Sequence, residues 1–253
     1  MQPPPAAVYA ILAGFCFSVS APFTKILSPE TTPLMLAAVF LLGSTAGTAV
    51  YAAFLYLYGQ DRRSIEAPLR KKELPWLFVV TLFGSIFPTL LIVYGVAATT
   101  ATTASFLFSF EGAATVIMAY ILFREAVGRR IWAAVICITL SCMIMSLGDG
   151  AEYFGFHFSY GAVLILFACL SWGIANSCIH MISSADPIYQ TLIRSGIGGL
   201  ILFFLALASG EVLPSFSVLL PGALVGFISY CFIHKIIRLF LDRVFSTSHV
   251  HLL

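Results

Sequence analysis

Long apolar runs follow one another along the chain, separated by short segments that carry charged residues, prolines or glycines. Each run is about 20 residues long, which is the length an α-helix needs to cross the hydrocarbon core of a bilayer. The runs are continuous and do not alternate with a period of two, so helices are favoured over the strands of a barrel. The pattern therefore predicts an all-α, polytopic membrane helix bundle.

About eight transmembrane helices are predicted from these runs. Their ranges are 6–26, 33–58, 74–97, 101–123, 131–147, 160–182, 187–208 and 219–241. Turn chemistry supports the breaks at SPETTP, GDG and SADP, and in the last of these Asp186 is expected to cap the helix that Pro187 begins. After Ala98 the chain has only threonine and alanine, and the turn there is predicted from span length alone.

Composition identifies lipid as the solvent and the main partner of this chain. Apolar residues make up 60% of the sequence and charged residues 9%, whereas a soluble domain has about 25% charged residues. Six cysteines all fall inside apolar runs without metal-ligand spacing, so they are interpreted as small buried hydrophobic residues. No metal, cofactor or nucleic-acid partner is expected.

Basic residues are distributed unevenly over the predicted loops. Loops on the N-terminal side hold Arg62, Arg63, Arg70, Lys71, Lys72, Arg124, Arg129 and Arg130, and the opposite side holds Lys25 alone. The positive-inside rule then places the N-terminus in the cytoplasm and, with eight spans, the C-terminus there too. A multi-pass protein of the cell membrane is predicted. The N-terminal run has no basic n-region, so we expect no removable signal peptide.

The two halves of the chain are weakly similar to each other. The segment AGFCFSVSAPFTKILS precedes ACLSWGIANSCIHMIS by 155 residues, and each is followed by a turn and a helix that contains glycine. Five predicted spans separate the copies, so they begin on opposite sides of the membrane. This parity predicts inverted repeats, a five-helix repeat over 1–148 and an incomplete repeat with an atypical C-terminal tail over 149–253. Many secondary transporters build a midplane site between such repeats.

Two segments resemble the EamA-type transporters of the drug/metabolite transporter superfamily. In TASFLFSFEGAATVIMAYILFREAVGRRIWAAVICITLSCMIM, residues 103–145, Glu111 stands at the family's intramembrane acidic or proline position early in the fourth helix. An apolar run, Glu125 and a basic turn follow, as in the family. The second segment, ACLSWGIANSCIHMISSADP, is similar to the opening of the family's second repeat, with Trp172 and Asn176 at the matching positions.

The resemblance covers the spans from about residue 6 to 232 and implies a secondary transporter, not an enzyme. It implies alternating access and efflux of small polar metabolites or drugs. Family members have ten helices, however, whereas this chain has three helices of the second repeat and ends in the charged segment IHKIIRLFLDRVFSTSHVHLL. We expect a truncated chain that is poorly stable or forms a homodimer; the alternative is eight native helices. The rival function is a non-transporting membrane protein or partner subunit.

Glu111 is the strongest candidate for a functional residue. It lies near the middle of its span, where an ionised side chain costs about 2.5 to 3.5 kcal/mol on insertion scales, so it must face protein or water. Thr115 and Met118 share its helix face. Taking up and releasing a proton would make proton coupling available at this residue. The alternative is a neutral glutamic acid that only hydrogen-bonds a neighbouring helix.

Trp172, Asn176 and His180 fall at i, i+4 and i+8 of one helix, a polar and aromatic stripe suited to a solute path. The alternative is an interfacial Trp and His with an Asn that ties helices together. In the next span Arg194 shares a face with Gln190 and could offer a cation to an anionic solute or to Glu111. Snorkelling to the membrane surface is the alternative explanation for Arg194.

Two further residues complete the predicted solute or coupling site. Ser18 shares a face with Lys25 and with Pro22, whose missing backbone N–H should kink the first helix and free a carbonyl for a solute. A purely mechanical bend is the alternative. Tyr94 offers a hydroxyl in the third helix, where the accompanying glycines otherwise indicate close packing. No catalytic residue is expected, because the GxSxG, HExxH and Walker motifs do not occur.

Overall fold

The computed structural model describes residues 20–57, 71–124, 126–148, 160–182 and 187–228, and every element in these ranges is helical. The elements are α2 (Ser20–Leu27), α3 (Pro33–Leu57), η2 (Lys71–Glu73), α4 (Leu74–Thr81), η3 (Leu82–Ile86), α5 (Phe87–Ala97), α6 (Ala101–Leu107), α7 (Phe110–Phe123), α8 (Arg129–Gly148), α9 (Tyr160–Cys178), η4 (Ile179–Ile182), α10 (Pro187–Ala208) and α11 (Phe216–Gly226). The predicted all-α bundle is confirmed.

Several helices have the length and composition of membrane spans. Within the described ranges five segments qualify, namely Pro33–Phe54, Leu74–Ala97, Ala101–Phe123, Tyr160–Cys178 and Ile188–Ala208. The helical bounds agree closely with the ranges predicted from the apolar runs. The predicted span over 131–147 corresponds to helix α8, which is not among these five. The start of the first predicted span and most of the eighth lie outside the described residues, so the count of eight spans stays a prediction.

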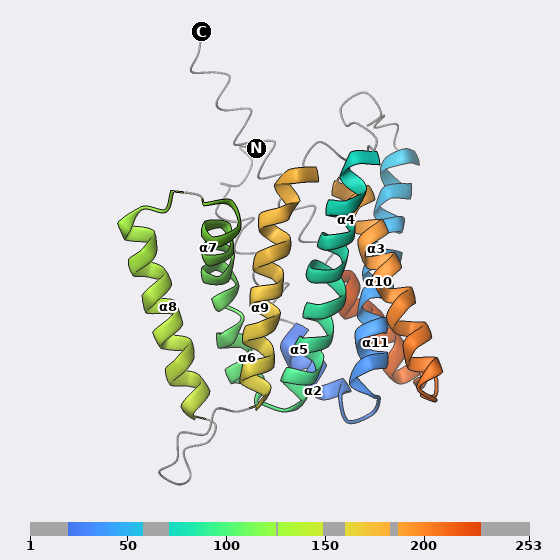
Figure 1. Cartoon of the computed structure of the whole chain (residues 1–253). Coiled ribbons are helices and arrows are strands. Elements are labelled where there is room, and N and C mark those ends of the chain that lie inside the picture. The colour runs from blue at the N-terminus through green and yellow to red at the C-terminus, as the bar shows by residue number, and fades with distance from the viewer. Residues whose placement is uncertain (1–19, 58–70, 125, 149–159, 183–186, 229–253) are drawn as a thin grey trace, which may run out of the picture.

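The helices lie side by side in two groups that meet at α9 (Figure 1). One group contains α6, α7 and α8, with α8 at the outer edge of the bundle. The other contains α3, against which both α10 and α11 pack, and α3 and α10 also contact the third span. Helix α9 lies between α7 and the α4–α5 span, and it contacts both. Polar groups on different faces of α9 can therefore reach different neighbours.

The turn after Ala98, which span length alone predicts, is present. Thr100 begins α6 by accepting a hydrogen bond from the backbone N–H of Thr103 at 3.2 Å. The ammonium group of Lys25 donates to the carbonyls of Val96, Ala97 and Thr99, at 3.3, 2.9 and 2.8 Å. These carbonyls belong to the last turn of α5 and to the turn that follows it, and the negative end of the helix dipole there favours a cation.

The third span contains a π-helical segment, η3, between α4 and α5. The backbone N–H of Phe87 bonds the carbonyl of Leu82, five residues back, instead of the carbonyl four residues back. Pro88 follows directly and has no N–H to donate. The predicted span over 74–97 is present as contiguous helix. The apolar run does not predict the π-helical segment, which occurs where proline removes an α-helical bond inside the span.

The fourth span is interrupted between α6 and α7, at Phe108 and Ser109. Ser109 N–H bonds the carbonyl of Phe106 and Glu111 N–H bonds the carbonyl of Phe108, both at 3.0 Å and three residues back. The span predicted over 101–123 is present, and the apolar run does not predict the interruption within it. Glu111 consequently stands in the first turn of α7, directly after the break.

Candidate functional site

Glu111 of α7 and Asn176 of α9 meet between the two helices. The amide nitrogen Nδ2 of Asn176 lies 3.3 Å from Oε1 of Glu111 and 3.3 Å from Oγ1 of Thr115. Thr115 donates its own hydroxyl proton to the carbonyl of Glu111, at 2.9 Å, which leaves its oxygen lone pairs to accept from Asn176. The predicted shared face of Glu111 and Thr115 is confirmed.

The close approach of α7 and α9 depends on Gly173, one turn before Asn176. A Cβ built on Gly173 would lie 2.8 Å from both the carbonyl carbon and the oxygen of Ala114. Backbone thus packs against backbone at this point, as small residues allow between membrane helices. The short side chain of Asn176 can therefore reach across the interface.

Trp172 points to a different neighbour. Its indole Nε1 donates to the carbonyl of Gly84 in η3 at 3.2 Å, and the side chain is only 7% exposed. The adjacent Ser171 donates its hydroxyl to the carbonyl of Phe83 at 2.8 Å. Trp172 and Asn176 therefore bind opposite neighbours of α9 and do not form one continuous stripe. The backbone of His180 lies in η4, but its side chain is outside the described part of the chain.

Arg194 of α10 lies beside the same π-helical segment. A methyl group built on Gly84 would be 3.5 Å from the guanidinium atom Nη1 of Arg194. Arg194 and Trp172, from different helices, thus both border Gly84. Gln190, which shares a helix face with Arg194 in the sequence, donates to the carbonyl of Ile182 at 2.8 Å and so caps the end of η4.

The remaining two predicted site residues are Ser18 and Tyr94. Ser18 falls outside the described residues. Tyr94 is 44% exposed on α5, and its predicted role in binding stays a prediction. Among the described residues no group of three His, Cys, Asp or Glu side chains is placed to hold a metal ion.

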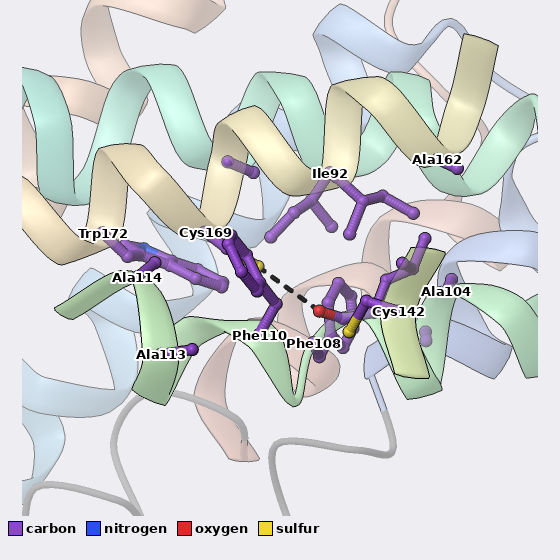
Figure 2. Close-up of a cluster of buried hydrophobic side chains, with 14 of the residues drawn as sticks. Ile92, Ala104, Phe108, Phe110, Ala113, Ala114, Cys142, Ala162, Cys169 and Trp172 are labelled. Atoms are coloured by element: carbon purple, nitrogen blue, oxygen red, sulfur yellow. Dashed lines mark hydrogen bonds between the residues drawn. The ribbon is translucent and has the colours of Figure 1, made fainter. Parts of the chain in front are cut away.

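The hydrogen bonds that Cys169 and Ser171 donate were not predicted from the sequence. The thiol of Cys169 donates to the carbonyl of Leu107 at 3.6 Å, shown by the dashed line in Figure 2. That carbonyl would bond Glu111 N–H in a regular helix, but the break redirects this N–H to Phe108. Pro88 indicates in the sequence that carbonyls of the third span need other donors, because proline has no N–H. Nothing near Pro88 in the sequence identifies Ser171 as one of these donors.

A small cavity lies beside the break in the fourth span. It has a volume of about 80 Å³ and is lined by Phe106, Ser109, Ile138, Ser141 and Cys142. Cys142 belongs to the buried cluster that Figure 2 shows around Cys169 and Trp172. The cavity therefore lies between α8 and the α6–α7 turn, at the edge of that cluster.

Comparison with known proteins connects these features to a family. Residues 4–147, more than half of the chain, match the EamA-like transporter family. A curated relative, described as an uncharacterized transporter of Methanothermobacter thermautotrophicus, is 23% identical over 209 residues, which cover 79% of this chain. The chain spans about 60% of the length of that relative. The match includes residues 103–145, and thus Glu111 and both sides of the break in the fourth span. With its apolar helices and this match, the chain is a multi-pass membrane protein that belongs to the EamA-like transporter family.

Proposed function

We propose that the chain is a secondary transporter that exports small polar metabolites or drugs by alternating access, with Glu111 as its proton-coupling residue. One observation carries the proposal. The carboxyl group of Glu111, in the predicted first repeat, accepts a hydrogen bond from Asn176, in the predicted second repeat, at 3.3 Å. Polar contacts between repeats near the bilayer midplane are where secondary transporters hold solutes and ions.

The position of Glu111 within its span supports this role. An acidic residue inside a membrane span is costly and tends to mark a solute or ion pathway. Glu111 also follows the break at Phe108 and Ser109, so it occupies the first turn of a half-helix. Discontinuous spans of this kind recur at the binding sites of secondary transporters. The break thus offers a polar backbone beside an ionisable side chain.

Hydrogen-bond chemistry explains how Glu111 would couple protons to a solute. An ionised carboxylate only accepts hydrogen bonds, and it can accept both from Asn176 and from a donor group of the solute. A protonated carboxyl group also donates, so its O–H needs an acceptor that the ionised form does not need. Protonation therefore changes which polar solute groups fit beside Asn176. We keep Trp172 and Arg194 as candidate site residues beside Gly84, at the neighbour of α9 opposite to Glu111.

The test uses purified protein in lipid vesicles with an imposed pH gradient. Ethidium and radiolabelled amino acids serve as transport probes for wild type, Glu111→Gln and the control Glu30→Gln, whose residue is exposed in a loop. Glu111→Gln keeps the size and hydrogen bonding of the side chain but removes its titration. We expect a loss of gradient-driven transport of at least tenfold for Glu111→Gln and none for the control. Unchanged transport across pH in Glu111→Gln would refute the coupling role.

The second candidate function is a non-transporting membrane protein or partner subunit, alone or as a homodimer. The chain matches only 60% of its relative's length, so the activity of a whole transporter is an inference for this chain. The same vesicles separate the two functions. Export of any probe by the purified protein supports the transporter. Properly inserted protein that moves none of them supports the partner subunit.

A further inference from the structure

Pro88 leaves two backbone carbonyls of the third span without their α-helical donors. The carbonyl of Gly84 would bond the N–H of residue 88, which proline lacks. The carbonyl of Phe83 would bond Phe87 N–H, but that group bonds Leu82 in the π-helical segment. An unpaired carbonyl inside a bilayer costs several kcal/mol, so both groups require another partner.

Helix α9 supplies both partners from consecutive residues. Ser171 donates to Phe83 at 2.8 Å and Trp172 donates to Gly84 at 3.2 Å. Gly84 makes this approach feasible, because a Cβ built on it would lie only 2.9 Å from Cβ of Ala175. The site of the lost helical bonds and the position of the side-chain donors therefore coincide.

These bonds also fix the position of α9 along its axis relative to its other neighbour, α7. Asn176 follows Trp172 by four residues, about one turn or roughly 6 Å along the axis. Asn176 reaches both Glu111 and Thr115 at 3.3 Å, so a small axial shift of α9 would break both contacts. The Trp172 bond to the third span and the Asn176 bonds to the fourth span are thus linked through one turn of α9.

We propose that Trp172 is a positioning residue: its indole N–H replaces the backbone donor missing at Pro88 and holds α9 at the depth where Asn176 reaches Glu111. The significance for transport rests on the proposed role of Glu111, but the bond and its effect on Asn176 do not. Ordinary packing of the indole ring is the competing explanation. Trp172→Phe separates the two, because it keeps an aromatic ring and removes the N–H.

The first test measures amide hydrogen exchange over residues 82–90 of the full-length protein in lipid nanodiscs. Loss of one net hydrogen bond predicts roughly two- to tenfold faster exchange in Trp172→Phe. Trp76→Phe is the matched control, since Trp76 is more than one-third exposed on α4. Adding Pro88→Ala to Trp172→Phe provides the missing N–H and should return exchange to near the wild-type rate. Equal exchange in Trp172→Phe and Trp76→Phe, or no recovery with Pro88→Ala, would overturn the replacement of the donor.

The second test observes Asn176 directly, because it is the only asparagine in the sequence. Labelling asparagine side chains with ¹⁵N gives one amide signal, which Glu111→Gln should shift. Trp172→Phe should shift and broaden the same signal, Trp76→Phe should leave it unchanged, and Pro88→Ala with Trp172→Phe should move it back. A wild-type signal in Trp172→Phe would overturn the positioning role. No transport assay enters this test, so its failure is distinct from a failure of the proposed function.

Discussion

Asn176 and Glu111 face each other across the interface of α9 and α7, with Nδ2 of the amide 3.3 Å from Oε1 of the carboxyl group. The same nitrogen lies 3.3 Å from the hydroxyl oxygen of Thr115, so both amide protons have acceptors on one helix. Sixty-five positions separate Glu111 from Asn176 in the sequence. Each consequence of this contact can be tested separately.

Replacing Asn176 by leucine should lower the free energy of unfolding and remove the interaction between residues 176 and 111. Hydrogen bonds between membrane helices contribute about 0.6 kcal/mol each on average, and two are lost here. A double-mutant cycle with Asn176→Leu and Glu111→Gln, followed by unfolding in mixed detergent, measures the coupling free energy. We expect a favourable coupling of a few tenths of a kcal/mol or more. Fully additive effects would show that the two side chains do not interact.

Gly173 should tolerate no side chain, in contrast to Gly112 on the facing helix. A methyl group at position 173 would meet the backbone of Ala114 at 2.8 Å, and such overpacking costs about 1 to 3 kcal/mol. A methyl group at position 112 meets nothing within 4 Å. Gly112→Ala should leave the free energy of unfolding unchanged or raise it by up to about 1 kcal/mol. Equal stability of the two variants would contradict the close contact of α7 and α9.

Lys25 should stabilise the turn between α5 and α6. Its three donors bind the carbonyls of Val96, Ala97 and Thr99, and bonds that involve a charged group contribute about 1.5 to 3 kcal/mol. Lys25→Met should lower the free energy of unfolding by about 2 kcal/mol. Lys72→Met, at an exposed position of η2, is the control and should have little effect. A Lys25→Met protein as stable as the control would exclude this role.

Both termini should lie in the cytoplasm if the chain crosses the membrane eight times, since basic loops gather on that side. A reporter fused after Leu253 is expected to be active only inside the cell. The same reporter inserted in the turn that begins after Leu27 should be active outside, because that turn precedes α3 on the opposite face. External activity of the fusion after Leu253 would mean an odd number of spans.

Most of the helix bounds could be predicted from the sequence, because they follow from local rules. Pro33 and Pro187 begin α3 and α10, and the lengths of the apolar runs matched the described spans. The π-helical segment of the third span and the interruption of the fourth could not be predicted from apolar runs alone. Hydropathy indicates whether a segment is surrounded by lipid or by water. It does not indicate which backbone hydrogen bonds form within the segment.

Of the candidate site, Glu111 and Asn176 were both identified from the sequence, but their pairing was not. Trp172 and Asn176 were expected to share one stripe, whereas α9 directs them to different neighbours. The donor role of Ser171 was missed altogether. Side-chain spacing along one helix defines its faces, but the neighbour that each face meets depends on how the whole bundle packs.

Three conclusions follow from the amino-acid sequence without coordinates: lipid surrounds this chain, its spans are helical, and a carboxyl group at position 111 must face away from lipid. These conclusions depend on the transfer cost of single residues and segments, which is a local property. The packing of the helices was needed to find that Asn176 meets Glu111 and that Ser171 and Trp172 bond the carbonyls of Phe83 and Gly84. Those donors lie 88 positions from their acceptors, and helix packing alone brings them together.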